Sequence, residues 1–104
     1  MLKLNNTTLQ VGEVYAFKLV TGEELLGKVE QINGNTIILD SPLQLATSAK
    51  GVGLAPACYT AKENPKVTFF ETAFISYFEP AEQFKVAYES AVTGIELPSK
   101  KIII

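Results

Sequence analysis

The chain contains no histidine, no tryptophan and no arginine, and it has one cysteine and one aspartate. Without histidine there is no imidazole to activate a serine or cysteine nucleophile, and without arginine there is no planar fork for a phosphate. A zinc site takes about four Cys, His or acidic ligands, which this composition does not favour. We therefore expect no enzyme activity, no catalytic residue, no metal or cofactor and no small-molecule substrate.

Reactive cysteines and paired catalytic carboxylates are scarce as well. Cys58 has no partner for a disulfide and stands in an apolar setting, which is typical of a small buried hydrophobe in a reducing cytosol. The close carboxylate pairs are Glu23-Glu24, just past a turn, and Glu79/Glu82, at the start of a predicted helix. Catalytic pairs need a cleft that raises one pKa, and the sequence indicates none. We interpret both pairs as surface charge.

Long apolar runs and an excess of basic charge are also missing. The formal net charge is -2 and the pI is about 5.1, which argues against charge-driven binding to duplex DNA or to an acidic membrane. No stretch approaches the ~20 apolar residues of a membrane span, and the N-terminal residues lack the apolar run of a signal peptide. With 104 residues, the chain is expected to be a single domain, 1–104, in the cytoplasm.

Three segments of β-branched and aromatic residues, separated by turn signals, predict strands in the first part of the chain: 14–20, 25–32 and 35–39. Thr21-Gly22 separates the first two segments. Asn33-Gly34 separates the second from the third and is the strongest short signal for a hairpin, because a type I′ turn needs positive φ at both central residues. Gly27, inside the second segment, predicts a bulge, a bend or a close backbone approach.

Beyond residue 40, the pattern leaves two interpretations of the third strand. Asp40-Ser41-Pro42 is a turn signal that ends the strand, whereas Leu43 to Ala49 is able to continue it. The remaining pattern predicts a loop, a strand, a polar loop and two short, very apolar strands, in this order: 51–53, about 54–60, 62–66, 67–70 and 74–78.

One helix is predicted after the strands, over about 80–93. Pro80 suits the first helical position, and Gly94 suits a left-handed helix end. Apolar side chains at intervals of three and four residues form one face for core packing: Ala81, Phe84, Ala87, Tyr88 and Ala91. The tail, 94–104, ends in three consecutive isoleucines and favours aggregation unless it is buried or paired as a strand.

The segment from Phe17 to Val29 resembles the first sequence signature of the Sm and Sm-like (LSm) RNA-binding family. Its pattern is apolar-x-Leu-x-x-Gly, four residues, Gly, then x-apolar, with Gly22 and Gly27 at the two glycine positions. In that family, the first glycine makes the turn between two strands and the second lets the sheet bend. The resemblance implies a mainly β fold, namely a small, strongly bent, five-stranded antiparallel open barrel (Sm-like or SH3-like), about 12–79, with one C-terminal helix.

Other features depart from the family. The family's turn before its third strand carries an acidic residue and an Asn, both used for RNA, whereas here that loop is one residue shorter and reads Asn33-Gly34-Asn35-Thr36. The family's Arg-Gly turn would fall at Phe70-Glu71-Thr72, where the pair is absent. The family's N-terminal helix has no room before Val14, and the helix here comes last. This combination is similar to small Sm-like proteins of tailed-phage origin (cyanophage, marine), whose compartment is the host cytoplasm.

Sm-like proteins form rings in which the fourth strand of one subunit pairs with the fifth strand of the next. The resemblance therefore implies a cyclic homo-oligomer. The two apolar strands in the second half of the chain carry no Lys or Pro within them, which suits such pairing. The interface residues expected on these strands are Val67, Phe69, Phe74 and Tyr77.

The resemblance also implies single-stranded RNA or DNA as a ligand. In a ring, the turns would converge on the central pore, where amide side chains hydrogen-bond splayed bases and lysines contact phosphates. The residues assigned to this role are Asn33, Asn35, Thr72, Lys62 and Lys66. A structural interpretation stands beside it, because Asn-Gly needs no ligand to explain it and loop lysines such as Lys50 are commonly solvated. Tyr59 and Phe74 either stack on bases or belong to the core.

Two classes of function follow from the sequence. The first is a ring that binds single-stranded RNA or DNA in nucleic-acid processing. The second is a structural or adaptor oligomer, phage-encoded, that uses the same barrel for protein contacts only. The acidic pI and the missing arginines favour the second class, whereas the two asparagines and the resemblance favour the first.

Overall fold

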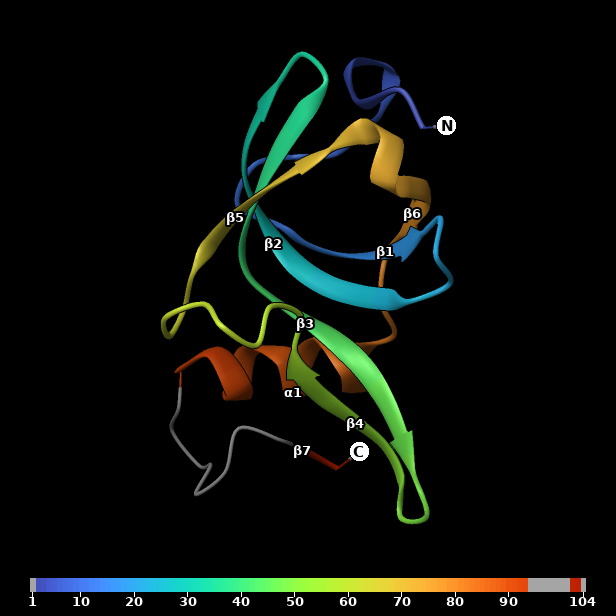
Figure 1. The fold of residues 1–104 in the computed structure, drawn as a ribbon, viewed down its shortest axis with the longest axis vertical. Coiled ribbons are helices and arrows are strands. Elements are labelled where there is room, and N and C mark those ends of the chain that lie inside the picture. Colours follow the sequence, from blue (N-terminus) through green and yellow to red (C-terminus); the bar gives the residue numbers. More distant parts are fainter. Residues whose placement is uncertain (1, 94–101, 104) are drawn as a thin grey trace.

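The secondary structure is mainly β-strand, with one α-helix after the strands (Figure 1). The structure, a computed structural model, describes residues 2–93, 102 and 103. Its strands are β1 (Val14–Leu19), β2 (Glu24–Asn33), β3 (Thr36–Ser48), β4 (Gly51–Pro56), β5 (Lys66–Phe70), β6 (Phe74–Phe78) and β7 (Ile102–Ile103). Its helices are α1 (Glu82–Thr93) and two short 3-10 helices, η1 (Leu4–Asn6) and η2 (Glu71–Ala73). The predicted fold class, mainly β with a helix near the C-terminus, is confirmed.

The third strand, β3, is longer than its first turn signal indicates. It does not end at Asp40 but continues to Ser48, which agrees with the second of the two interpretations. Ser41 adopts a left-handed φ of 52°, which bends the strand without ending it, and residues 43–48 find a ladder partner in β4. The loop predicted at 51–53 was wrong, because these residues belong to that partner strand, and β4 ends at Pro56 rather than near residue 60.

The strands form one antiparallel sheet in the order β6-β1-β2-β3-β4-β7, and β5 also pairs with β3. β5 pairs with residues 36–40 of β3, before the bend, whereas β4 pairs with residues 43–48, after it. The first half of β3 therefore belongs to a barrel-like sheet, β6-β1-β2-β3-β5, which curls so that β5 crosses over β2 (Figure 1). The second half of β3 forms a long hairpin with β4 that extends away from the barrel.

Alternate strand residues pack into two separate cores. The first core lies inside the barrel-like sheet and includes Phe17, Leu39 and Phe74, with Leu4 of η1 buried against them. The second core lies between the other face of the sheet and α1, and its buried members are Val14, Ala16, Leu26, Leu54 and Tyr88. Ala16 and Phe17 are neighbours on β1 and point to different cores, because successive side chains of a strand face opposite sides.

The predicted apolar face of the helix packs on the second core, with Tyr88 buried and Phe84 and Ala87 beside it. Ala81 lies before the first residue of α1 and is exposed. The helix begins two residues later than predicted, at Glu82, and ends at Thr93. Gly94, the predicted left-handed terminator, lies outside the described residues.

The hydroxyl of Tyr88 joins two strands where the sheet bends. The register of β2 against β3 shifts here, because Leu26 pairs with Leu43 whereas Lys28 pairs with Asp40. The Tyr88 hydroxyl donates to the Asp40 carbonyl at 2.6 Å and accepts the Lys28 backbone N–H at 3.2 Å. Tyr88 is 2% exposed, and this burial raises the pKa of its hydroxyl above the ordinary tyrosine value. A helix side chain thus satisfies two backbone groups at the interruption of the ladder.

Gly27 lies at the same bend, with a core side chain directly against it. A Cβ atom at this position would stand 3.1 Å from Cδ1 and 3.3 Å from Cβ of Leu39. Leu39 is fully buried in the first core, so it has little space into which it can retreat. The absence of a side chain at Gly27 therefore allows β2 and β3 to approach each other inside the curved sheet.

The turn between β2 and β3 differs from the predicted type. Asn33 pairs with Thr36, so the two central residues of the turn are Gly34 and Asn35. Of these two, only Gly34 has a positive φ, 59°. This pattern is typical of a type II′ turn, which takes glycine at the first central position. The prediction of a hairpin was therefore right. The prediction of type I′ was wrong, because the turn is centred one residue later in the chain than expected.

The C-terminal isoleucines reach the other edge of the sheet. Ile102 pairs with Leu54, and Ile103 pairs with Gly53. This part of the isoleucine run is therefore paired as a strand, which the sequence indicated as one way to avoid aggregation. Within the described part of the chain, no helix is long and apolar enough to cross a membrane.

Replacing Tyr88 with Phe should destabilise the protein, because the Lys28 N–H and the Asp40 carbonyl lose a shared buried partner. We expect the free energy of unfolding to fall by ~1–3 kcal/mol, the usual range for leaving buried polar groups unsatisfied. Urea denaturation at neutral pH measures this loss. Tyr59→Phe is the matched control, because Tyr59 is 77% exposed and its hydroxyl has no such role.

The raised pKa of Tyr88 also predicts how stability depends on pH. Tyrosine in the unfolded chain ionises near pH 10, about its ordinary pKa, whereas folded Tyr88 stays protonated to higher pH. Its contribution to stability is therefore complete below about pH 10 and is lost as the pH rises above it. The alkaline decrease in unfolding free energy should be shallower in Tyr88→Phe than in the wild type. Equal slopes in the two proteins would contradict this assignment.

Replacing Gly27 with Ala should lower the free energy of unfolding by ~1–3 kcal/mol, because the new methyl group overpacks the contact with Leu39. The cause is tested by making the same change in a Leu39→Ala protein, where the 3.1 Å contact with Cδ1 no longer exists. There, Gly27→Ala should cost less than in the wild type. An equal cost in both backgrounds would show that the contact with Leu39 is not the reason.

Candidate functional site

Three of the residues assigned to nucleic-acid binding lie together at one end of the barrel-like sheet. We call this the turn end and define it as Asn33, Gly34 and Asn35, in the β2–β3 turn, and Thr72, in η2. The Asn35 carbonyl accepts the backbone N–H of Glu71 at 2.8 Å, so the turn is bonded to η2 directly. All four residues are exposed, and the turn projects at the top of Figure 1.

The side chains of the turn end differ in how far they are already engaged. The Asn33 side-chain oxygen accepts a hydrogen bond from the Gln31 amide at 3.1 Å, and the Thr36 hydroxyl bonds the Asn33 carbonyl at 3.1 Å. The amide of Asn35 and the hydroxyl of Thr72 make no hydrogen bond within the described part of the chain. These two groups can therefore donate to and accept from a ligand without breaking a bond of the fold.

The N-terminal segment packs beside η2, which the sequence did not predict. Glu71 accepts the Leu4 backbone N–H at 3.2 Å through one carboxylate oxygen, and the other oxygen lies 4.0 Å from the Lys3 ammonium. The Glu71 side chain is only 12% exposed, whereas that of Lys3 is 60% exposed. The only sequence signal was the apolar pair Leu2 and Leu4, which is too short to define an element.

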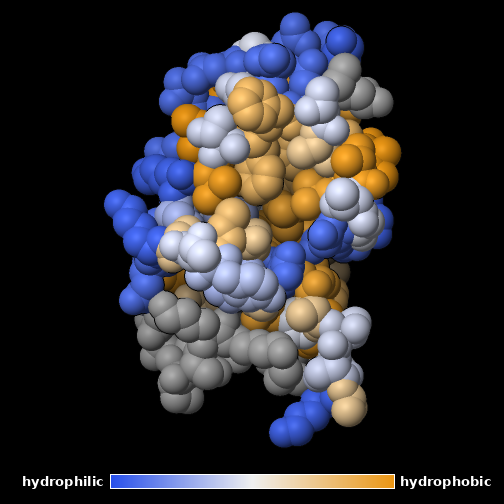
Figure 2. All heavy atoms as spheres, viewed as in Figure 1, coloured by the Kyte–Doolittle hydropathy of each residue, from blue (hydrophilic) through white to orange (hydrophobic). Residues whose placement is uncertain are grey.

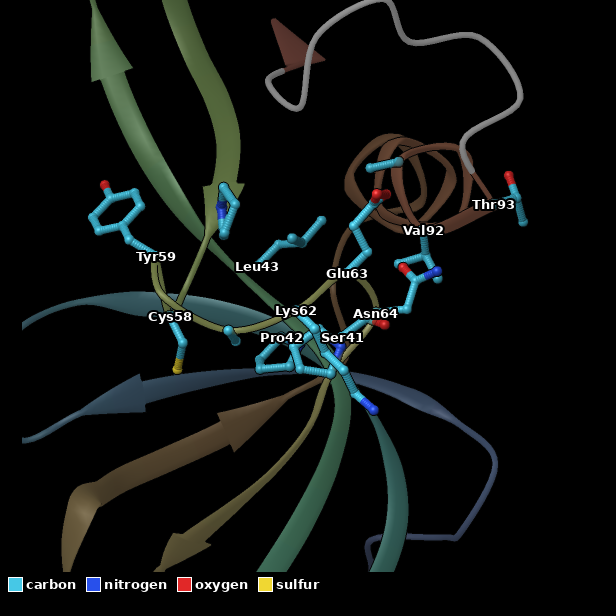
Figure 3. Close-up of a pocket in the computed structure, with 14 residues that line it drawn as sticks. Ser41, Pro42, Leu43, Cys58, Tyr59, Lys62, Glu63, Asn64, Val92 and Thr93 are labelled. Atoms are coloured by element: carbon cyan, nitrogen blue, oxygen red, sulfur yellow. The ribbon is translucent and has the colours of Figure 1, made fainter.

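The two assigned lysines lie elsewhere. Lys66 begins β5 and Phe70 ends it next to η2, so Lys66 stands about 13 Å from the turn end along the strand, at roughly 3.3 Å per residue. Its ammonium lies 3.1 Å from a Glu30 carboxylate oxygen. Lys62 lies in the loop before β5, and its side chain points away from α1 (Figure 3). The turn end therefore carries amide and hydroxyl groups, but neither Lys62 nor Lys66 lies there.

The residues expected at a subunit interface are largely occupied within the single chain. Phe74 is fully buried, and Phe69 and Tyr77 pack against the first core, while Val67 is half-buried. The exposed apolar side chains of the same two strands are Phe70, Ile75 and Phe78, which are 60%, 53% and 41% exposed. Figure 2 shows apolar surface on the upper half of the molecule, which holds the barrel-like sheet.

β5 and β6 each keep one edge without a strand partner. Among the described residues, β5 pairs only with β3, and β6 pairs only with β1. The two strands are joined by η2 but do not pair with each other. The barrel-like sheet is therefore open between them, and each edge offers backbone N–H and C=O groups to a further strand.

A cavity of about 520 Å³ lies between the loop before β5 and the end of α1. In Figure 3, the Glu63 and Asn64 side chains point toward α1, whereas those of Tyr59 and Cys58 point away from it. Cys58 is half-buried rather than fully buried. Within the described residues, no three Cys, Asp or Glu side chains are grouped to hold a metal ion. The cavity lining includes Cys58, Lys62 and Glu63, but the Cys58 side chain points away from the side on which Glu63 faces α1 (Figure 3).

Comparison with known proteins adds no assignment. No family model matches the chain, and no curated protein is significantly similar to it.

Proposed function

We propose that this chain is an Sm-like protein that assembles with copies of itself and binds single-stranded RNA or DNA at the turn end. The observation that carries the proposal is the hydrogen bond from Glu71 to Asn35. It joins the turn after β2 to the turn before β6, and in Sm-like proteins the corresponding two turns form the RNA site. This bond between the two turns supports the resemblance, which begins with the segment from Phe17 to Val29.

The open edges support the assembly part of the proposal. An antiparallel strand pair formed between β5 of one copy and β6 of the next would satisfy both edges. Because these are two different surfaces, the contact is heterologous and closes into a ring when the rotation per copy fits. The exposed side chains Phe70, Ile75 and Phe78 would lose apolar surface to water in such a contact.

The chemistry of the turn end indicates what part of a nucleic acid it would contact. Asn35 and Thr72 offer an amide and a hydroxyl, which pair with the edges of unstacked bases. Lys3 is a cation that the structure places beside η2, and it already faces Glu71. Binding would therefore rest on base contacts, would be modest in affinity and would depend only weakly on salt, because few phosphate charges are neutralised.

A structural or adaptor oligomer without nucleic-acid binding is the second candidate. The exposed apolar residues of β5 and β6 favour assembly whether or not a nucleic acid binds. The net charge of -2 and the absence of arginine favour a surface that contacts protein. The two candidates share the assembly and differ only in the use of the turn end.

Fluorescence anisotropy of short oligo-U, oligo-A and oligo-dT at about 50 mM salt separates the two candidates. We expect binding by the wild type and a roughly tenfold weaker affinity for Asn33→Ala/Asn35→Ala, since each lost amide hydrogen bond costs about 0.5–1.5 kcal/mol. Alanine keeps the Asn35 carbonyl and therefore keeps the bond to Glu71.

Lys62→Ala is the control, because Lys62 lies away from the turn end and its loss should leave the affinity within about twofold. Failure of an assembled wild-type protein to bind any of the three oligonucleotides would favour the adaptor. Equal binding by the double variant would place the nucleic acid elsewhere on the protein.

A further inference from the structure

A second, smaller cavity lies where β6 ends, at the opposite end of that strand from η2 and the turn end. Its volume is about 330 Å³, and its lining comes from the N-terminal segment and from the adjoining ends of β1 and β6: Thr8, Gln10, Glu13, Tyr15, Tyr77 and Glu79. Glu13 immediately precedes β1 and Glu79 immediately follows β6. Because these two strands are antiparallel neighbours, the two carboxylates come to the same end of the sheet.

The cavity walls are held in place by hydrogen bonds. The Tyr15 hydroxyl accepts the Gln10 backbone N–H at 3.1 Å, and the Tyr77 hydroxyl accepts the Thr8 backbone N–H at 3.1 Å. The two tyrosine rings meet edge to face, with centroids 6.2 Å apart. No cationic side chain lines the cavity, and neither carboxylate forms an ion pair within the described residues. Phenolic oxygens and unpaired carboxylates together suit an ammonium group.

The open edge of β6 leads directly to this cavity, and the open edge of β5 begins with a lysine. If β5 of one copy lies antiparallel to β6 of the next, the start of β5 meets the end of β6. Lys66 then stands next to Glu79, and Phe70 stands at the other end, near Ile75. A parallel arrangement would instead bring Lys66 toward Phe74 and away from both carboxylates. Antiparallel pairing thus places the positive Lys66 beside the negative Glu79 and apolar surface against apolar surface. It is also the more stable kind of strand pairing.

We propose that the second copy of this chain is the occupant of the cavity: the Lys66 ammonium of one copy inserts between Glu13 and Glu79 of the next. This proposal rests on the assembly proposed above and assigns its orientation and its charged contact. Lys66 can give up its ion pair with Glu30 for this contact, because that ion pair lies at the surface, with side chains 58% and 40% exposed. Such pairs contribute little to the stability of a single chain.

A charge reversal tests the contact. Lys66→Glu and Glu79→Lys should each raise the protein concentration at half-assembly by about tenfold or more, because each places like charges across the contact. The double variant restores opposite charges and should return to within about threefold of the wild type. Sedimentation velocity over a concentration series measures the midpoint. Thermal unfolding of each protein, diluted below its midpoint, shows that the single chain still folds.

Matched reversals elsewhere on the surface serve as controls. Lys50→Glu changes an exposed lysine at the tip of the β3–β4 hairpin, and Glu89→Lys changes an exposed carboxylate on α1. Both should assemble like the wild type. If the Lys66 and Glu79 variants behave like these controls, or if the double variant does not recover, the contact is wrong although assembly stands. A wild type that remains monomeric at every concentration overturns the assembly and this contact together.

Discussion

The bend of β3 at Ser41 and Pro42 is the constraint on which the rest of the structure depends. Before the bend, the strand belongs to the barrel-like sheet, and after it the strand belongs to a hairpin with β4. A bend of this kind interrupts the ladder with β2 and exposes backbone groups to an apolar interior. The Tyr88 hydroxyl bonds one such group on each strand. The helix therefore does more than cover a sheet face, because it satisfies the backbone where the sheet changes direction.

The same bend determines what remains open. Because β4 occupies only the second half of β3, the first half is free to pair with β5, and η2 then turns the chain so that β6 pairs with β1. The sheet curls but does not close between β5 and β6. One end carries the bonded pair of turns with the free Asn35 and Thr72 side chains, and the other carries an acidic cavity with no cation of its own. The two proposed contacts, with nucleic acid and with a second copy, thus lie at opposite ends of the same open edge.

Local signals in the sequence predicted the first two hairpins and the helix, because these depend on neighbours in the chain. Thr21-Gly22 and Asn33-Gly34 mark both turns, and the three- and four-residue spacing around Tyr88 marks the helix face. The course of the chain after Asp40 was not predictable in the same way. Whether Ser41 ends or bends a strand depends on β4, a partner that lies later in the chain. The role of the Tyr88 hydroxyl depends on groups 48 and 60 residues away.

The candidate site shows the same division. The family resemblance assigned Asn35 and Thr72 to the same role, and the structure brings both residues to one end of the sheet. Lys62 and Lys66 lie away from Asn35 and Thr72 because β5 runs from Lys66 toward η2. The sequence does not predict this direction. The sequence indicates that successive side chains of β5 and β6 alternate between two faces. It does not indicate which set of side chains faces the core. Phe74 belongs to the core, whereas Phe70 and Ile75 are exposed, because that choice is made by pairing with β3 and β1.

Hydrogen exchange of the β5 and β6 amides at two protein concentrations tests the central claim, that these open edges pair between copies. Edge amides that lack a partner in the single chain exchange quickly, and pairing with another copy slows them. We predict that exchange within residues 66–70 and 74–78 slows as the protein is concentrated, while exchange in α1 stays unchanged. Equal exchange of both strands in dilute and concentrated protein would contradict it.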